Sequence, residues 1–185
     1  HMTLEQLREI FPNATVDTWH KHPNGGGWVQ NTAHVDESSQ VYGNAWVYGD
    51  AKVYGDAKVS GNAWVYGDAQ VSGNAKVSGD AKVYGNAKVY GDAQVSGDAQ
   101  VYGNAWVYGD AKVSGRTAMV YIQNVAEWGS ITGFLCADDL VRVTCGCRYF
   151  TIADARAYWG NRIDRARTLI AVEFLATVLS PADKK

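Results

Sequence analysis

The sequence contains no long apolar run and no marked excess of charge of either sign. Within its 185 residues no segment approaches the length of a transmembrane helix, and no secretory signal peptide is recognisable. We therefore expect a soluble protein that resides in the cytoplasm. The formal net charge of −2 favours neither a nucleic-acid-binding stripe nor an acidic mimic of nucleic acid.

Residues that bind metals or form disulfides are also scarce. The chain has four histidines and three cysteines, Cys136, Cys145 and Cys147. Zinc would need a fourth ligand beside these cysteines, and no histidine is near them in the sequence. An odd number of cysteines without a signal peptide favours reduced, buried thiols over a disulfide framework. His20 and His22 lie close together, but the nearest third imidazole is His34, so we predict neither a metal site nor a cofactor.

The dominant feature is a six-residue repeat that runs from Val29 to about Ala118. Valine recurs at every sixth position as far as Val113, which gives fifteen consecutive hexads, and twelve of them contain Gly-Asn or Gly-Asp two residues after the valine. A six-residue period does not place apolar residues on one face of a helix. Glycine accepts a positive φ, and Asn or Asp bonds to nearby backbone, so each dipeptide favours a tight turn. Each hexad is therefore predicted to form a short strand followed by a corner.

One valine and one alanine per hexad cannot bury a face alone, so successive turns must stack on one another. The hexads resemble the hexapeptide repeat of left-handed parallel β-helices, in which an aliphatic residue is followed four positions later by a small one. Here the small residue is alanine except at Ser39 and Thr117. The resemblance implies a mainly β fold with three hexads in each triangular coil, and hence five coils that rise about 24 Å.

Three hexads in a coil would stack residues eighteen positions apart and create three faces of different composition. The third face carries lysine, glutamine and serine, which is typical of a solvated surface. The first face concentrates seven outward aromatic side chains: Trp28, Trp46, Trp64, Tyr48, Tyr66, Tyr84 and Tyr102. The second face is mixed and carries His34, Lys52, Gln70, Lys88 and Trp106 beside Asp36, Tyr54, Ser72, Tyr90 and Tyr108.

The seven aromatic residues of the first face are the predicted binding surface. Large apolar patches are rare on monomers, and Trp and Tyr are enriched at interface anchors. Proteins with the hexapeptide repeat usually form trimers about an axis parallel to the helix, so the resemblance implies a homotrimer through this face. Two alternatives stay open: the rings stabilise the coil by stacking on one another, or they bind a ligand or a foreign protein.

The segment before the coils, residues 1–28, is predicted to cap the β-helix. Thr3 to Ile10 has the pattern of a short helix with Thr3 as N-cap, Glu5 in the first turn, and Leu4, Leu7 and Ile10 on one face. A loop or short extended piece follows, and Gly25–Gly27 is interpreted as a flexible join into the coils. The first two hexads of the 29–118 domain lack the corner glycine and have Asn31 and Glu37 there, as expected of atypical terminal repeats.

The segment after the coils, residues 119–185, is predicted to form a small α+β cap. Strands are expected at 120–122, 131–136 and 140–145, the last two as a hairpin through residues 137–139. A helix is expected from Thr151, as N-cap with Asp154 as partner, to Trp159, with Gly160 as its stop. A longer helix should span residues 162–179. Its apolar face would comprise Ile163, Ala166, Ile170, Phe174 and Val178.

The same repeat fold hosts acyltransferases, carbonic anhydrases, ice-binding proteins and scaffolds, so the fold alone does not define a function. The resemblance to hexapeptide acyltransferases implies a histidine as general base, but His34 is the only histidine in the coils, with no carboxylate or nucleophile in evidence. A carbonic anhydrase needs several imidazoles, and an ice-binding face needs threonine, which the coils largely lack. We therefore predict that the protein is not an enzyme.

The prediction that remains is a non-catalytic homotrimer that binds a partner. The uninterrupted hexads, the cysteine-containing hairpin and the two-helix tail look like proteins encoded by bacteriophages and prophages. That resemblance implies a counter-defence role in the host cytoplasm, either by occupying a host immune protein or by sequestering a nucleotide signal between subunits. A structural or virion-associated protein is one alternative, and an acyltransferase-like enzyme is another.

Overall fold

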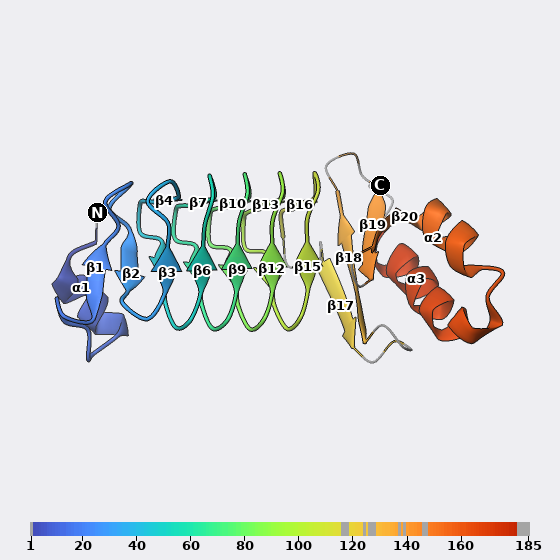
Figure 1. The fold of residues 1–185 in the computed structure, drawn as a ribbon, viewed down its shortest axis with the longest axis horizontal. Helices are drawn as coiled ribbons and strands as arrows, with labels where there is room; N and C mark the ends of the chain where they lie inside the picture. Colours follow the sequence, from blue (N-terminus) through green and yellow to red (C-terminus); the bar gives the residue numbers. More distant parts are fainter. Residues whose placement is uncertain are drawn as a thin grey trace, which may run out of the picture.

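The protein is an elongated β-helix with a cap at each end (Figure 1). The structure is a computed structural model. It describes residues 2–115, 119–123, 125, 129–136, 138, 140–145 and 148–180. Among these residues no helix is both long and apolar enough to cross a membrane.

Three parallel sheets form the sides of the coils, and each corresponds to one of the three predicted faces. The first sheet contains β2 (Trp28–Gln30), β5 (Trp46–Val47), β8 (Trp64–Val65), β11 (Lys82–Val83) and β14 (Gln100–Val101). The second contains β3 (His34–Val35), β6 (Lys52–Val53), β9 (Gln70–Val71), β12 (Lys88–Val89) and β15 (Trp106–Val107). The third contains β4 (Gln40–Val41), β7 (Lys58–Val59), β10 (Lys76–Val77), β13 (Gln94–Val95) and β16 (Lys112–Val113).

Strand pairing gives the number of residues in a coil. Trp46 pairs with Trp64 in the first sheet, and Lys88 pairs with Trp106 in the second. Both pairs are eighteen residues apart, so three hexads complete one turn. The prediction of a parallel β-helix with about five triangular coils is confirmed.

The interior of the coils is a continuous column of valine and alanine. From Val41 to Val113 every valine and alanine of the repeat is fully buried. The backbone is satisfied between coils: the N–H of Trp46 donates to the carbonyl of Ala63 at 3.0 Å, and that of Tyr48 donates to Val65 at 3.0 Å. Burial of small branched side chains therefore combines with a complete hydrogen-bond ladder to hold adjacent coils together.

The corners need glycine for two separate reasons, as Gly79 shows. Its φ is +69°, a region that residues with a Cβ rarely adopt. A Cβ added there would also lie 2.9 Å from the backbone nitrogen of Gly97 in the next coil. The Gly79 corner can therefore approach the backbone of the next corner at strand spacing only because Gly79 has no side chain.

The N-terminal cap consists of α1 (Leu4–Ile10) and β1 (Trp19–Lys21), which pairs antiparallel with β2 at the edge of the first sheet. The predicted N-cap is confirmed, because Thr3 and Gln6 form a capping box. Leu7 is fully buried, whereas Ile10 is 44% exposed, so only part of the predicted apolar face is buried.

The interpretation of Gly25–Gly27 as a flexible join is wrong. The N–H of Gly27 donates to the carbonyl of Val41 at 2.7 Å, and Gly26 forms a bridge with Tyr42. A Cβ on Gly27 would lie 2.6 Å from Cγ1 of Val41. The glycines allow this turn to pack directly against the coil.

The C-terminal cap is a four-stranded antiparallel sheet covered by two helices. Its elements are β17 (Met119–Gln123), β18 (Ser130–Leu135), β19 (Val141–Cys145), β20 (Arg148–Thr151), α2 (Ile152–Trp159), the 3₁₀ helix η2 (Ile163–Arg165) and α3 (Ala166–Leu179). Figure 1 shows this sheet between the last coil and the helices. Strand β20 was missed by the sequence analysis, and residues 137, 139 and 147 lie outside the described part of the chain.

Alternation along β18 explains how this sheet joins two cores. Phe134 and Cys136 pack against the valine column of the coils, while Ile131 packs against the helices. Successive residues of a strand point to opposite faces, so one strand serves both cores. Cys136 and Cys145 are buried free thiols, as predicted for both.

The first cap helix begins as predicted. The Thr151 hydroxyl accepts from the N–H of Asp154 at 3.1 Å and donates to its carboxylate at 2.7 Å. The helix ends at Gly160, but this glycine has a φ of −59° and does not use the left-handed conformation.

The predicted apolar face of the second cap helix is wrong. The structure buries Thr168, Ala171, Val172, Leu175 and Leu179 of α3. Ile170, Phe174 and Val178 are 68%, 51% and 45% exposed. Because α3 is apolar on most of its circumference, the sequence period did not reveal which side packs on the sheet.

Candidate ligand pocket and aromatic surface

The seven predicted aromatic residues project from the first sheet, but they do not form one free surface. Trp28 and Trp46 are only 6% and 4% exposed. They pack in a cluster with Leu7 and Trp19 of the N-terminal cap. For these two tryptophans the inference of an open binding face is wrong, because the chain covers them with its own N-terminal segment.

The four tyrosines of this face form a stacked ladder along the coils. Tyr48 and Tyr66 have ring centroids 4.9 Å apart with an interplanar angle of 3°, and Tyr66 and Tyr84 are 5.0 Å apart at 4°. Tyr102 continues the stack and is 40% exposed. Burial, and secondly the neighbouring Tyr66, raises the pKa of Tyr48 to about 12. Stacking between rings of successive coils thus stabilises the β-helix, and Tyr102, the last ring, stays partly exposed.

Beside the ladder, Trp64 lines a hollow of about 370 Å³ under the N-terminal cap. Asn44, Asn62 and Asp80 line the same hollow. Lys82 lies with its ammonium 4.2 Å from the centroid of the Trp64 ring. A cation from the next coil therefore packs against the Trp64 ring.

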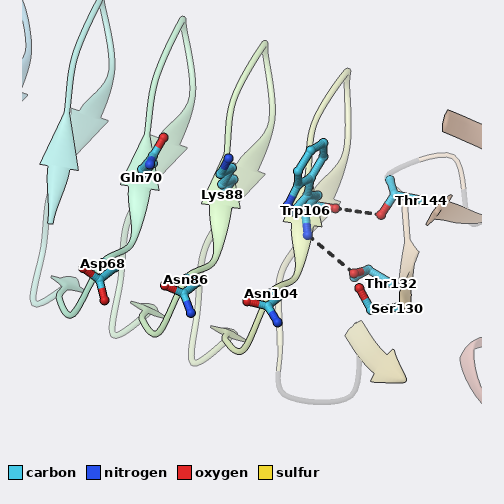
Figure 2. A pocket seen from close by; sticks show the side chains of 9 residues that line it. All are labelled: Asp68, Gln70, Asn86, Lys88, Asn104, Trp106, Ser130, Thr132 and Thr144. Carbon is cyan, nitrogen blue, oxygen red and sulfur yellow. Dashed lines mark hydrogen bonds between the residues drawn. The ribbon is translucent and has the colours of Figure 1, made fainter. Parts of the chain in front are cut away.

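A larger pocket of about 690 Å³ lies on the second face, where the coils meet the C-terminal cap (Figure 2). The sequence analysis did not predict it. Its lining comprises Asp68, Gln70, Asn86, Lys88, Asn104, Trp106, Ser130, Thr132 and Thr144. Two columns from the coils form one wall, and β18 and β19 close the end.

Two threonines of the cap end the second sheet at Trp106. The Thr132 hydroxyl accepts from the backbone N–H of Trp106 at 3.4 Å, and Thr144 donates to the Trp106 carbonyl at 2.9 Å (Figure 2). Thr132 pairs directly with Thr144 in the cap sheet, and both are nearly buried. These hydroxyls bond to the Trp106 backbone groups with which a further coil would otherwise pair. They thus satisfy the hydrogen-bonding groups at the edge of the second sheet and hold the Trp106 backbone in place.

The corner residues that line the pocket differ from those at the other two corners. At each of the other two corners some side chains bond between coils: Asn62 donates to Asp80 at 2.9 Å, and Asn74 donates to Asp92 at 3.0 Å. In contrast, the exposed side chains of Asp68, Asn86 and Asn104 form no hydrogen bond with any described residue. Figure 2 shows these three at successive corners along one side of the pocket. Their donors and acceptors are available to a ligand.

Lys88 and Trp106 form the second column of the pocket. The Lys88 ammonium lies 5.0 Å from the centroid of the Trp106 ring, and the edge of Tyr90 meets the same ring at 6.4 Å. Both Lys88 and Trp106 are half-buried. The indole is thus held on two sides by residues of the preceding coil.

The histidines bond to separate partners. A His20 ring nitrogen lies 2.7 Å from the Asn31 amide oxygen, and a His22 ring nitrogen lies 3.0 Å from the Ser39 carbonyl. The statement that no carboxylate accompanies His34 is wrong, because Asp36 lies 2.9 Å from its Nε2. The His34 and Asp36 side chains are 70% and 42% exposed in the first coil, and neither lines the pocket beside Trp106.

The sequence held one signal for the pocket that we did not use. Trp106 stands at the end of a second-face column otherwise made of His, Lys and Gln. A bulky ring in the last coil indicates that this position contacts something other than a further coil. The position of Thr132 and Thr144 against it could not be predicted, because no repeat relates the cap to the coils.

Comparison with protein families gives one match within the coils. The YdcK β-solenoid repeat matches residues 39–55, 81–97 and 99–115. Neither the curated proteins nor the solved structures gave a match. The matched segments and the five stacked coils together establish that the chain is a β-solenoid repeat protein.

Proposed function

We propose that the protein is a non-catalytic binding protein whose ligand pocket lies beside Trp106. The observation that supports this most is the set of uncommitted corner side chains. Asp68, Asn86 and Asn104 line a pocket of about 690 Å³ and make no side-chain hydrogen bond with a described residue. Backbone hydrogen bonds join the coils that carry them, such as that from the N–H of Asn86 to the carbonyl of Gly103 at 2.9 Å, so we expect little ordering when a ligand binds.

Equilibrium dialysis against a bacterial extract freed of macromolecules tests this proposal. The wild-type protein should concentrate at least one small molecule, identified by mass spectrometry, and Trp106→Ala should lose that enrichment. Trp64→Ala is the matched control, because Trp64 occupies the same hexad position on the first face. Circular dichroism checks that both variants fold. Enrichment that persists in Trp106→Ala, or the lack of any in the wild type, would contradict the proposal.

The proposal includes self-association as a homotrimer through the tyrosine ladder. The support is that Tyr102, the last ring of the stacked ladder, is 40% exposed, so a second copy can pack against this side of the coils. Light scattering should give three times the chain mass of 20.1 kDa. Tyr102→Ser should lower this mass, and Tyr54→Ser should not, since Tyr54 is 38% exposed on the second face. A monomeric wild type would refute this part.

The finer proposal is counter-defence in the cytoplasm of a phage-infected host. Its support is the resemblance of the hexad array and two-helix tail to phage-encoded proteins. A host immune protein would bind at the exposed Tyr102 of the tyrosine ladder, or a nucleotide signal would be sequestered between subunits. A pull-down that compares the wild type with Tyr102→Ser tests whether a host immune protein binds. Titration with cyclic nucleotides tests whether a nucleotide signal binds.

A further inference from the structure

We propose that the pocket beside Trp106 binds a neutral saccharide. This inference depends on the proposed function, because it names the ligand class of the same pocket. Among the nine lining residues, Asp68 and Lys88 are the charged ones, and their charges cancel.

A phosphate-bearing ligand does not match this charge distribution. Phosphate sites combine Arg or Lys side chains with backbone N–H groups at a helix N-terminus. The coil wall of this pocket supplies a single lysine, and the carboxylate of Asp68 on the same wall would repel an anion. Electrostatics therefore favours an uncharged ligand over a nucleotide.

The available hydrogen-bonding groups match hydroxyl groups. The amides of Asn86 and Asn104 each offer two N–H donors and an acceptor oxygen, and the carboxylate of Asp68 accepts only. None of the three bonds to another described side chain. A sugar hydroxyl donates and accepts at once, so it can satisfy an amide and a carboxylate in turn along the wall. Burial of unpaired groups by an apolar ligand would be unfavourable.

The spacing of these groups favours an oligosaccharide that lies along the helix axis. Gln70, Lys88 and Trp106 are in register on adjacent strands, and the corner residues repeat with the same eighteen-residue step. Adjacent coils are about 4.8 Å apart, so similar polar groups recur at that interval. A chain of hydroxylated rings presents its own groups at regular intervals, and each ring could bond to a successive coil.

Trp106 supplies the apolar part of the pocket. A pyranose has hydroxyl groups around its rim and C–H groups on its faces, so it combines well with an aromatic ring set among amides. Thr132 and Thr144 hold the Trp106 backbone through the two hydrogen bonds in Figure 2. These bonds fix the Trp106 backbone at the closed end of the pocket, and Lys88 and Tyr90 contact its ring.

Isothermal titration with cellotetraose, tetra-N-acetylchitotetraose and maltotetraose tests the inference, with ATP and a cyclic dinucleotide as charged comparators. At least one tetrasaccharide should bind, and Asn104→Ala should weaken its binding about tenfold through the loss of hydrogen bonds. Asn74→Ala is the matched control, because Asn74 occupies the same hexad position at another corner, where it bonds to Asp92. It should bind as the wild type does. Thermal melting confirms that both variants fold.

The outcomes separate this inference from the proposed function. Binding of a nucleotide but of no tetrasaccharide, with Trp106→Ala abolishing it, would overturn the saccharide class and support the proposed function. Saccharide binding that Asn104→Ala leaves unchanged would overturn the inference as well. No binding by any of these probes would overturn the saccharide class. The dialysis experiment then decides the proposed function independently.

Discussion

The Thr144 hydroxyl donates a hydrogen bond to the backbone carbonyl of Trp106 at 2.9 Å, and so joins the C-terminal cap to the last coil. Thr144 is 3% exposed, and its replacement by valine would leave that carbonyl without this hydrogen-bond partner. We expect Thr144→Val to lower the free energy of unfolding by about 1–3 kcal/mol. Chemical denaturation measures the loss.

The control for this substitution is Ser114→Ala, which removes an exposed hydroxyl from the last coil. It should change the free energy of unfolding by less than about 0.5 kcal/mol. If Thr144→Val proved as stable as the wild type, the two threonines would not be the residues that end the second sheet.

The corner glycines give a prediction that separates backbone strain from steric contact. Gly79→Ala combines a φ of +69° with a Cβ 2.9 Å from Gly97, so it should cost more than the 1–3 kcal/mol expected of strain alone. Gly129 has a φ of +76°, and a Cβ there would meet no described atom within 4 Å. Gly129→Ala should therefore cost only the strain.

Gly115 completes this comparison, since it has no positive φ and its nearest contact would be an Asp98 oxygen at 3.8 Å. Gly115→Ala should be neutral or stabilise the protein by under about 1 kcal/mol, because it restricts the unfolded chain. Thermal melts of the three variants should rank them in this order. Equal stability of Gly79→Ala and Gly115→Ala would refute the close packing of corners.

The orientation of α3 is tested by two neighbouring substitutions. Leu175 is fully buried, so Leu175→Ala should lower the free energy of unfolding by about 2–5 kcal/mol. Phe174 is 51% exposed, and Phe174→Ala should cost much less although it removes a larger side chain. The reverse ranking in urea denaturation would restore the face predicted from sequence.

Alkaline pH should destabilise the protein through Tyr48. Its folded-state pKa of about 12 lies above the ordinary value of 10.0, chiefly because of burial. The contribution of the neutral phenol is complete below pH 10 and is lost as the pH rises towards 12. Tyr48→Phe should reduce this loss of stability, and tyrosinate absorbance should show one late-titrating group fewer. An identical pH dependence in both proteins would contradict the assignment.

How far the sequence predicts the molecule depends on whether a residue belongs to the repeat. The valine period and the corner Gly-Asn or Gly-Asp pairs predict strand and corner without reference to distant residues. The eighteen-residue register came from the resemblance to the hexapeptide repeat, which implies three hexads in each coil. The outward direction of Trp46 followed too. Its burial did not, because it depends on how the N-terminal helix docks across the first coils.

The same limit applies to the pocket. Asp68 and Asn104 repeat the corner pattern of Asn62 and Asn74, so nothing local distinguishes them. What distinguishes them in the structure is the cap beside their column and the lack of a bonded neighbour along it. The face of α3 was missed for a related reason, since a helix that is apolar on most sides does not indicate which side is covered.

The most direct test of the account is to observe which tryptophan contacts the ligand. The molecule recovered by dialysis would be titrated into nitrogen-15-labelled protein, whose seven tryptophans give separate indole N–H resonances that single substitutions assign. The account predicts that the Trp106 resonance shifts while those of Trp28 and Trp46, buried under the N-terminal cap, stay in place. A shift of Trp64 with Trp106 unchanged would place the ligand on the first face and contradict the account.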